Sequence, residues 1–149
     1  MSRRFMLLLT LVASLATSCD DDDPAGPAAP SLVGTWNLTA IELVSVANSS
    51  VRVDLMDEGV TGSLILEGNG DFVLSVIDPV EGLESFTGTW SMTDVLTLEH
   101  DPGQFVGEWQ FDVTLTGNTL RLTGADAEFD FNDDGVEDPA KLNISGTRA

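Results

Sequence analysis

Residues Trp109–Thr116 read WQFDVTLT, and this stretch decides the fold class. Large apolar side chains stand at every second position, with polar side chains between them. Successive side chains of a β-strand point to opposite faces, so strict alternation predicts a strand with one buried face. The stretch is therefore typical of a half-buried strand.

The same period continues on both sides of this stretch. The other alternating apolar rows are Leu64 with Leu66; Phe72, Leu74 and Val76; Phe86 with Trp90; Leu96 with Leu98; Leu120 with Leu122; Phe129 with Phe131; and Leu142 with Ile144. Turn-forming residues separate them, as in Gly68-Asn69-Gly70 and Gly117-Asn118. We predict an all-β fold, a small antiparallel up-and-down β-barrel of eight or nine strands. Residues 48–59 stay ambiguous, because their alternation falls among turn formers.

The 149 residues leave room for one domain, and the chain is strongly acidic. Asp and Glu number 25 against 6 Lys and Arg, a formal net charge of −19. Nucleic-acid binding needs basic patches, so we expect no nucleic-acid partner. A single cysteine allows no intramolecular disulfide, and the fold must depend on its core. We expect a monomer.

The N-terminus has the organisation of a targeting segment. Arg3 and Arg4 precede an apolar run over residues 5–16, which is too short to span a membrane. Small residues follow, and then Cys19. This order resembles the bacterial lipoprotein signal. The resemblance implies cleavage before Cys19 and attachment of palmitate-type acyl chains to it, which anchors the protein in a membrane. An ordinary secretory peptide with an unmodified cysteine is the alternative.

This resemblance divides the chain into three parts. Residues 1–18 would be the signal peptide, residues 19–31 the lipidated cysteine with an acidic, Pro-rich linker, and residues 32–149 the barrel domain. The linker sequence after the cysteine is DDDDPAGPAAPS, which we expect to be an extended, disordered tether. Removal of Arg3 and Arg4 would take the net charge from −19 to −21. We expect the protein to be located in the bacterial cell envelope, at the outer membrane or cell surface rather than at the inner membrane.

Three Gly-x-Trp motifs punctuate the predicted barrel. They are Gly34-Thr35-Trp36, Gly88-Thr89-Trp90 and Gly107-Glu108-Trp109. The first resembles the opening of the first lipocalin strand, and EGNGDF (67–72) with GTWSMTDVLTL (88–98) resembles later strands of bacterial lipocalin-like lipoprotein domains. The resemblance implies that Trp36 closes one end of the barrel under an arginine, either Arg148 or, second, Arg121.

The barrel interior bears on function. The inward rows are bulky, and residues 32–149 number only 118, which together favour a packed core over a large calyx. We expect a membrane-anchored envelope protein that binds a small apolar ligand or an envelope partner. The alternative is a structural module, stabilised by calcium, with a filled core and no ligand.

Residues Asp130–Asp138, DFNDDGVED, match the first half of a calcium-loop pattern. The candidate metal ligands are Asp130, Asn132, Asp134, the Val136 carbonyl and Asp138. Lys141 takes the place of the bidentate Glu at the twelfth position, which leaves only a weak site with a Kd of about 10⁻⁴–10⁻³ M. A solvated hairpin turn is the alternative. Calcium is the one cofactor that the sequence suggests.

The sequence offers little for catalysis. Its one histidine, His100, precedes Asp101-Pro102-Gly103 and is predicted to lie in an exposed loop. A single histidine without cysteines does not make a zinc site, and Cys19 would be consumed by lipid. We predict that the protein is not an enzyme.

Overall fold

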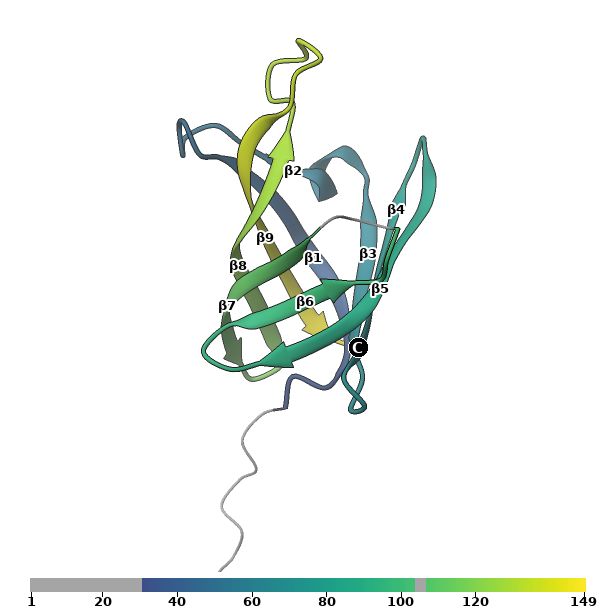
Figure 1. The fold of residues 1–149 in the computed structure, drawn as a ribbon. Helices are drawn as coiled ribbons and strands as arrows, with labels where there is room; N and C mark the ends of the chain where they lie inside the picture. Colours follow the sequence, from purple (N-terminus) through teal and green to yellow (C-terminus); the bar gives the residue numbers. More distant parts are fainter. Residues whose placement is uncertain (1–30, 104–106) are drawn as a thin grey trace, which may run out of the picture.

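A computed structural model describes residues 31–103 and 107–149, which form nine strands and one short 3₁₀ helix (Figure 1). The elements in chain order are β1 (Gly34–Ser45), β2 (Arg52–Asp54), η1 (Leu55–Glu58), β3 (Thr61–Leu66), β4 (Asp71–Asp78), β5 (Gly82–Met92), β6 (Leu96–His100), β7 (Glu108–Thr116), β8 (Thr119–Phe129) and β9 (Asp138–Arg148). Every pairing is antiparallel.

The sheet closes on itself as a barrel. Its order is β2-β1-β3-β4-β5-β6-β7-β8-β9, and β1 also pairs with β9, so eight strands form the ring. The ninth, β2, pairs with the second half of β1, from Glu42 to Val44. The predicted all-β up-and-down barrel is therefore confirmed. The ambiguous residues 48–59 form a turn, β2 and η1.

Alternation in the sequence becomes burial in the structure. In β7, Trp109 and Phe111 are buried while Gln110 and Asp112 are exposed. The strands are joined by the expected turns, for example at Gly117-Asn118 between β7 and β8. Gly88 is required where β5 crosses β6, because a Cβ there would lie 1.9 Å from the carbonyl oxygen of Glu99.

One end of the barrel is closed by a solid core. The largest fully buried side chains are Trp36, Phe72, Phe111, Leu64, Leu66, Leu96, Leu98, Leu120, Leu122 and Ile144. The aromatic residues predicted to complete the interior are less buried. Phe86, Trp90, Phe129 and Phe131 are partly exposed and pack against the edge of the core. Trp90 lies at the closed end, where its indole N–H donates to the Glu67 carbonyl, whereas Phe129 and Phe131 lie toward the tip of the β8–β9 hairpin, where the packing is looser.

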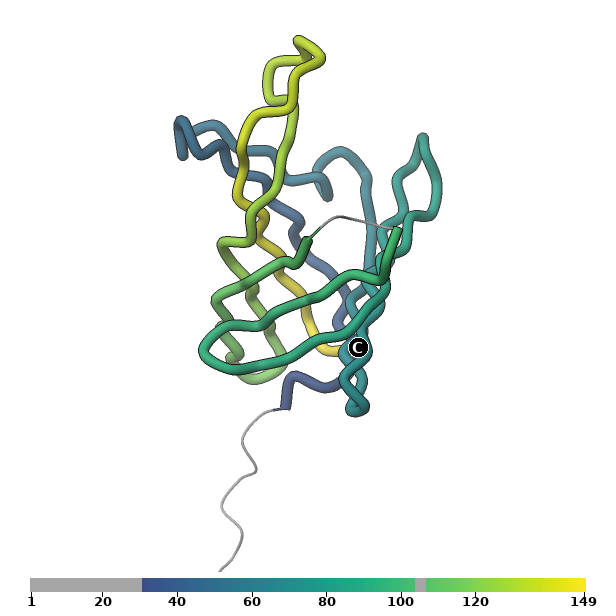
Figure 2. The backbone as a smooth tube through the Cα atoms, viewed as in Figure 1, coloured from purple at the N-terminus to yellow at the C-terminus, as the bar shows by residue number. Residues whose placement is uncertain are grey.

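The wall of the barrel is lower on one side. β5 pairs with β4 over residues 82–89, but with β6 only over residues 88–92. β8 likewise pairs with β7 only up to Thr123 and then continues beside β9 alone as far as Phe129. The β4–β5 and β8–β9 hairpins thus rise beyond β6 and β7, as the backbone trace in Figure 2 shows. Among the described residues, the edge of β5 at Leu83 and Ser85 has no strand partner on that side.

Candidate functional site

The closed end is built around Trp36 and Arg148. The guanidinium carbon of Arg148 lies 4.3 Å from the Trp36 ring centroid, in the geometry of a cation–π contact. Arg148 also donates hydrogen bonds to the carbonyl oxygens of Val33 (2.9 Å) and Ser31. The Trp36 indole N–H donates to the carbonyl of Leu32 at 2.9 Å. The structure thus brings together the pair that the lipocalin resemblance implied, whereas Arg121 is exposed on β8.

Gly34 shows why the first motif is Gly-x-Trp. Its φ is +144°, a conformation that favours glycine. A Cβ at this position would lie 2.5 Å from a guanidinium nitrogen of Arg148. Any larger residue would therefore displace the arginine from the Trp36 ring. Both residues serve the architecture of the closed end.

An apolar cup lies at the opposite, open end. Its volume is about 180 Å³, and it is lined by eight apolar residues and one acidic residue: Ile41, Leu55, Leu74, Val76, Phe86, Trp109, Leu142, Ile144 and Glu84. The lining comes from β1, η1, β4, β5, β7 and β9. Leu142, Ile144 and Leu74 are buried, so the walls belong to the same core that fills the closed end. We take this cup as the candidate binding site.

The strand register places two lining pairs side by side. Leu74 is opposite Phe86, and Val76 is opposite Glu84, on β4 and β5. On the other side, η1 brings Leu55 over the cup. The Asp54 carboxylate accepts hydrogen bonds from the backbone N–H of Met56 (3.0 Å) and of Ile41 (3.1 Å), which ties η1 to β1.

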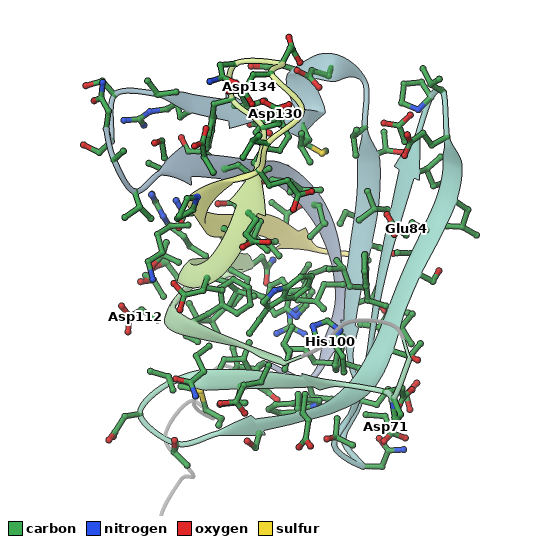
Figure 3. The ribbon with its side chains drawn as sticks, turned by 45° about the horizontal axis from the view of Figure 1, so that its top comes forward. Asp71, Glu84, His100, Asp112, Asp130 and Asp134 are labelled. Carbon is green, nitrogen blue, oxygen red and sulfur yellow. The ribbon has the colours of Figure 1, made fainter. Side chains whose placement is uncertain are left out.

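Phe86 and Trp109, the two aromatic residues in the cup lining, also pack against His100. The His100 ring centroid lies 4.4 Å from that of Trp109 and 5.5 and 5.9 Å from those of Phe72 and Phe86, all edge-on. His100 is the last residue of β6 and is 8% exposed. Its predicted place in an exposed loop is wrong, because the strand continues to the residue before Asp101-Pro102. Figure 3 shows His100 within the barrel.

The environment of His100 changes its protonation. Burial lowers the pKa of the imidazole below its ordinary value of 6.5, and the charge of Asp101 opposes this shift only in part. The ring is therefore neutral at pH 7, and its flat faces fit the surrounding aromatic side chains. These contacts indicate a packing role beneath the cup.

Glu84 is the residue that the sequence analysis missed. Its side chain is exposed, yet it lies on the same face of β5 as the side chain of Phe86, which comes two residues later in the strand. A charged residue at an inward position of an alternating row was the signal that could have revealed it. In Figure 3, Glu84 lies between the level of His100 and that of the Asp130–Asp134 loop.

The acidic loop forms the tip of the β8–β9 hairpin (Figure 3). The Asp130 carboxylate accepts hydrogen bonds from the backbone N–H groups of Asn132, Asp134 and Gly135, at 3.3, 3.2 and 2.8 Å. These bonds, the one from Gly135 above all, lower the pKa of Asp130 below its ordinary value of 3.8. Asp134 in turn accepts from the N–H of Val136 (2.8 Å).

The five predicted metal ligands are thus close in sequence but belong to different parts of the hairpin. Asp138 is the first residue of β9 and pairs with Phe129. Among the described residues, no three His, Cys, Asp or Glu side chains converge in a way that could hold a metal ion. The predicted hairpin turn is present, and calcium stays a prediction.

Cys19, the predicted signal peptide and the predicted linker as far as residue 30 lie outside the described residues. Within 31–103 and 107–149, no helix has the length and apolar character needed to cross a membrane. No model of a known protein family matches the sequence, and no curated protein matches it. The closed eight-stranded antiparallel barrel is compatible with the lipocalin-like resemblance.

Proposed function

We propose that the protein is a lipid-anchored lipoprotein of the bacterial envelope whose barrel binds a small apolar ligand in the cup. The observation that carries the binding role is the cup itself, an apolar hollow of about 180 Å³ at the open end of an otherwise filled barrel. A concave, mostly apolar site with few polar groups is the usual form of a ligand site.

The volume limits the ligand. Sites for drug-sized molecules are roughly 300–1,000 Å³, and this cup is smaller. An apolar cavity of about 150 Å³ is enough to bind benzene. The cup therefore suits one ring or a short branched chain, and a whole lipid would not fit in it. His100 is held among aromatic rings beneath the cup, which supports a binding role without catalysis.

The anchoring role rests on the sequence of the N-terminus. Arg3 and Arg4, the short apolar run and the small residues before Cys19 stand in the order of a lipoprotein signal. Expression in a bacterium fed labelled palmitate tests this role. We expect label on the wild-type protein and in its membrane fraction, and neither with Cys19→Ala. Label that persists in Cys19→Ala, or an unlabelled wild type in solution, would overturn the anchor.

Ligand-observed NMR tests the binding role, since it detects weak binding of small molecules. The probe is benzyl alcohol, and the protein is the chain from residue 19 onward with Cys19→Ser, which lacks the apolar signal segment and the lipid and therefore needs no detergent. We expect binding that is lost in Val76→Trp, whose larger side chain fills the cup. Thr114→Val, on the exposed face of β7, is the control and should bind as the parent does. Equal binding by Val76→Trp, or none by the parent chain, would support a structural module without a ligand.

A further inference from the structure

We infer that the cup selects a cationic ligand, a small apolar amine whose ammonium group is held by Glu84. This inference rests on the proposed binding role of the cup and names the chemical class that the cup takes. It follows from the position of one carboxylate, from the positions of the basic residues and from the size of the cup.

Among the residues that the structure describes, Glu84 is the only charged one in the lining of the cup. It stands opposite Val76 on β4 and two residues before Phe86, so it belongs to the inward row of β5. A core position in a strand is normally apolar, and charged side chains are rarely turned toward an interior. At the rim, Glu84 keeps its carboxylate in water while its stem borders the apolar wall. A ligand in the cup would thus meet one negative charge beside its outer end.

The basic residues of the described chain lie elsewhere. Arg52 pairs with Glu42 (3.2 Å), Lys141 pairs with Asp126, and Arg148 is stacked on Trp36. Arg121 is on β8, and none of these four lines the cup. Within residues 31–103 and 107–149, no Lys or Arg forms an ion pair with Glu84. A cation on the ligand would supply the missing counter-charge.

The charge of the whole chain acts in the same direction. At a net charge of −19, the surface attracts cations and repels anions at low salt. An anionic ligand such as a fatty acid would meet this field and the Glu84 carboxylate together. The size of the cup then restricts the apolar part of the amine to about one ring.

A competing explanation for Glu84 is protection of a strand edge. Charges turned inward near an unpaired edge prevent edge-to-edge association, and Glu84 lies between Leu83 and Ser85 on the open edge of β5. This explanation predicts that Glu84 has no effect on ligand choice and that its removal promotes self-association.

The experiment compares three probes of similar size by ligand-observed NMR: benzylamine (cationic), benzyl alcohol (neutral) and benzoate (anionic). The chain again begins at residue 19 with Cys19→Ser, and Glu84→Gln is compared with Glu81→Gln, a matched loss of charge on the neighbouring turn outside the cup. Melting temperatures and sedimentation confirm that each variant is folded and report its association state. Titrations run at 10 mM and at 1 M salt, where the Debye length falls from about 30 to about 3 Å.

At low salt we expect benzylamine to bind about three- to fivefold more tightly than benzyl alcohol, with benzoate weakest, as for an exposed ion pair. Glu84→Gln should remove the preference for benzylamine, so that benzylamine binds no more tightly than benzyl alcohol, while Glu81→Gln keeps the preference. High salt should reduce the preference in the parent chain.

Equal binding of benzylamine and benzyl alcohol, or a preference that survives in Glu84→Gln, would overturn the amine assignment while leaving the apolar site intact. Binding of benzylamine that Val76→Trp does not reduce would place it outside the cup and overturn the assignment too. If benzyl alcohol fails to bind to every variant, the proposed binding role of the cup is itself wrong. Self-association of Glu84→Gln with unchanged ligand preference would show that Glu84 protects the edge instead.

Discussion

Replacing Arg148 with methionine tests whether the closed end holds the barrel together. The variant keeps much of the apolar stem but removes the charge over the Trp36 ring, 4.3 Å from its centroid. It also removes the hydrogen bonds to the carbonyls of Val33 and Ser31. The perturbation therefore acts on both ends of the described chain at once.

The expected loss follows from these three contacts. Arg148 is partly buried, so the cation–π contact should contribute about 1 kcal/mol. Each hydrogen bond to a solvent-accessible carbonyl should contribute about 0.5 kcal/mol. The sum is about 2 kcal/mol, which at a urea m-value of about 1.5 kcal/mol/M lowers the unfolding midpoint by roughly 1.3 M.

Urea unfolding followed by tryptophan fluorescence measures this loss. Arg121→Met is the matched control, because Arg121 is exposed on β8 and should change stability by less than about 0.5 kcal/mol. Equal midpoints for the two variants would refute the role of Arg148 at the closed end. A large loss in both would show that the charge of the barrel matters more than this contact.

Three further predictions address other parts of the barrel. Gly88→Ala should destabilise the protein by more than about 2 kcal/mol, because its Cβ would clash with the Glu99 carbonyl. Gly68→Ala is the control, since a Cβ there would make only ordinary contacts. The midpoints of urea unfolding of the two variants are compared, and similar midpoints would contradict the clash. Millimolar calcium should raise the melting temperature of the parent chain and not that of Asp134→Ala; a parent chain that does not respond removes calcium from consideration. Because the pKa of His100 is lowered in the folded protein, its contribution to stability is complete above pH 6.5 and is lost as the pH falls through the folded-state pKa. The difference in stability between the parent chain and His100→Gln, measured by urea unfolding from pH 5 to 8, should therefore change below pH 6.5. A change centred above that value would contradict burial as the cause.

The fold could be predicted because alternation is a local property. Trp109 and Phe111 are buried and Gln110 is exposed, as a period of two requires. The turn residues between the rows predicted eight or nine strands, and the structure has nine, eight of them in the closed ring. The short strand β2 was left ambiguous, since only three of its residues pair, and they pair with the second half of β1, eight to twelve residues away.

The site could not be predicted in the same way, because it depends on which strands stop short. The cup exists because β6 and β7 end below the β4–β5 and β8–β9 hairpins, and strand length is poorly encoded in local sequence. His100 was misplaced for a related reason, since the turn residues after it do not reveal how far the strand continues. Glu84 was visible in the sequence, but only its pairing with Val76 in the structure places it beside the cup.

The hydrogen bonds from Arg148 to the carbonyls of Ser31 and Val33 fix the end at which the chain enters the barrel. That end is the closed one, and Figure 1 shows it at the opposite end of the barrel from the tip of the β8–β9 hairpin. Twelve residue steps separate Cys19 from Ser31, so a lipid on Cys19 would hold this end within about 40 Å of the bilayer. Because such a tether would be attached at the closed end, it would leave the mouth of the barrel unobstructed and open to solutes arriving from the surrounding water.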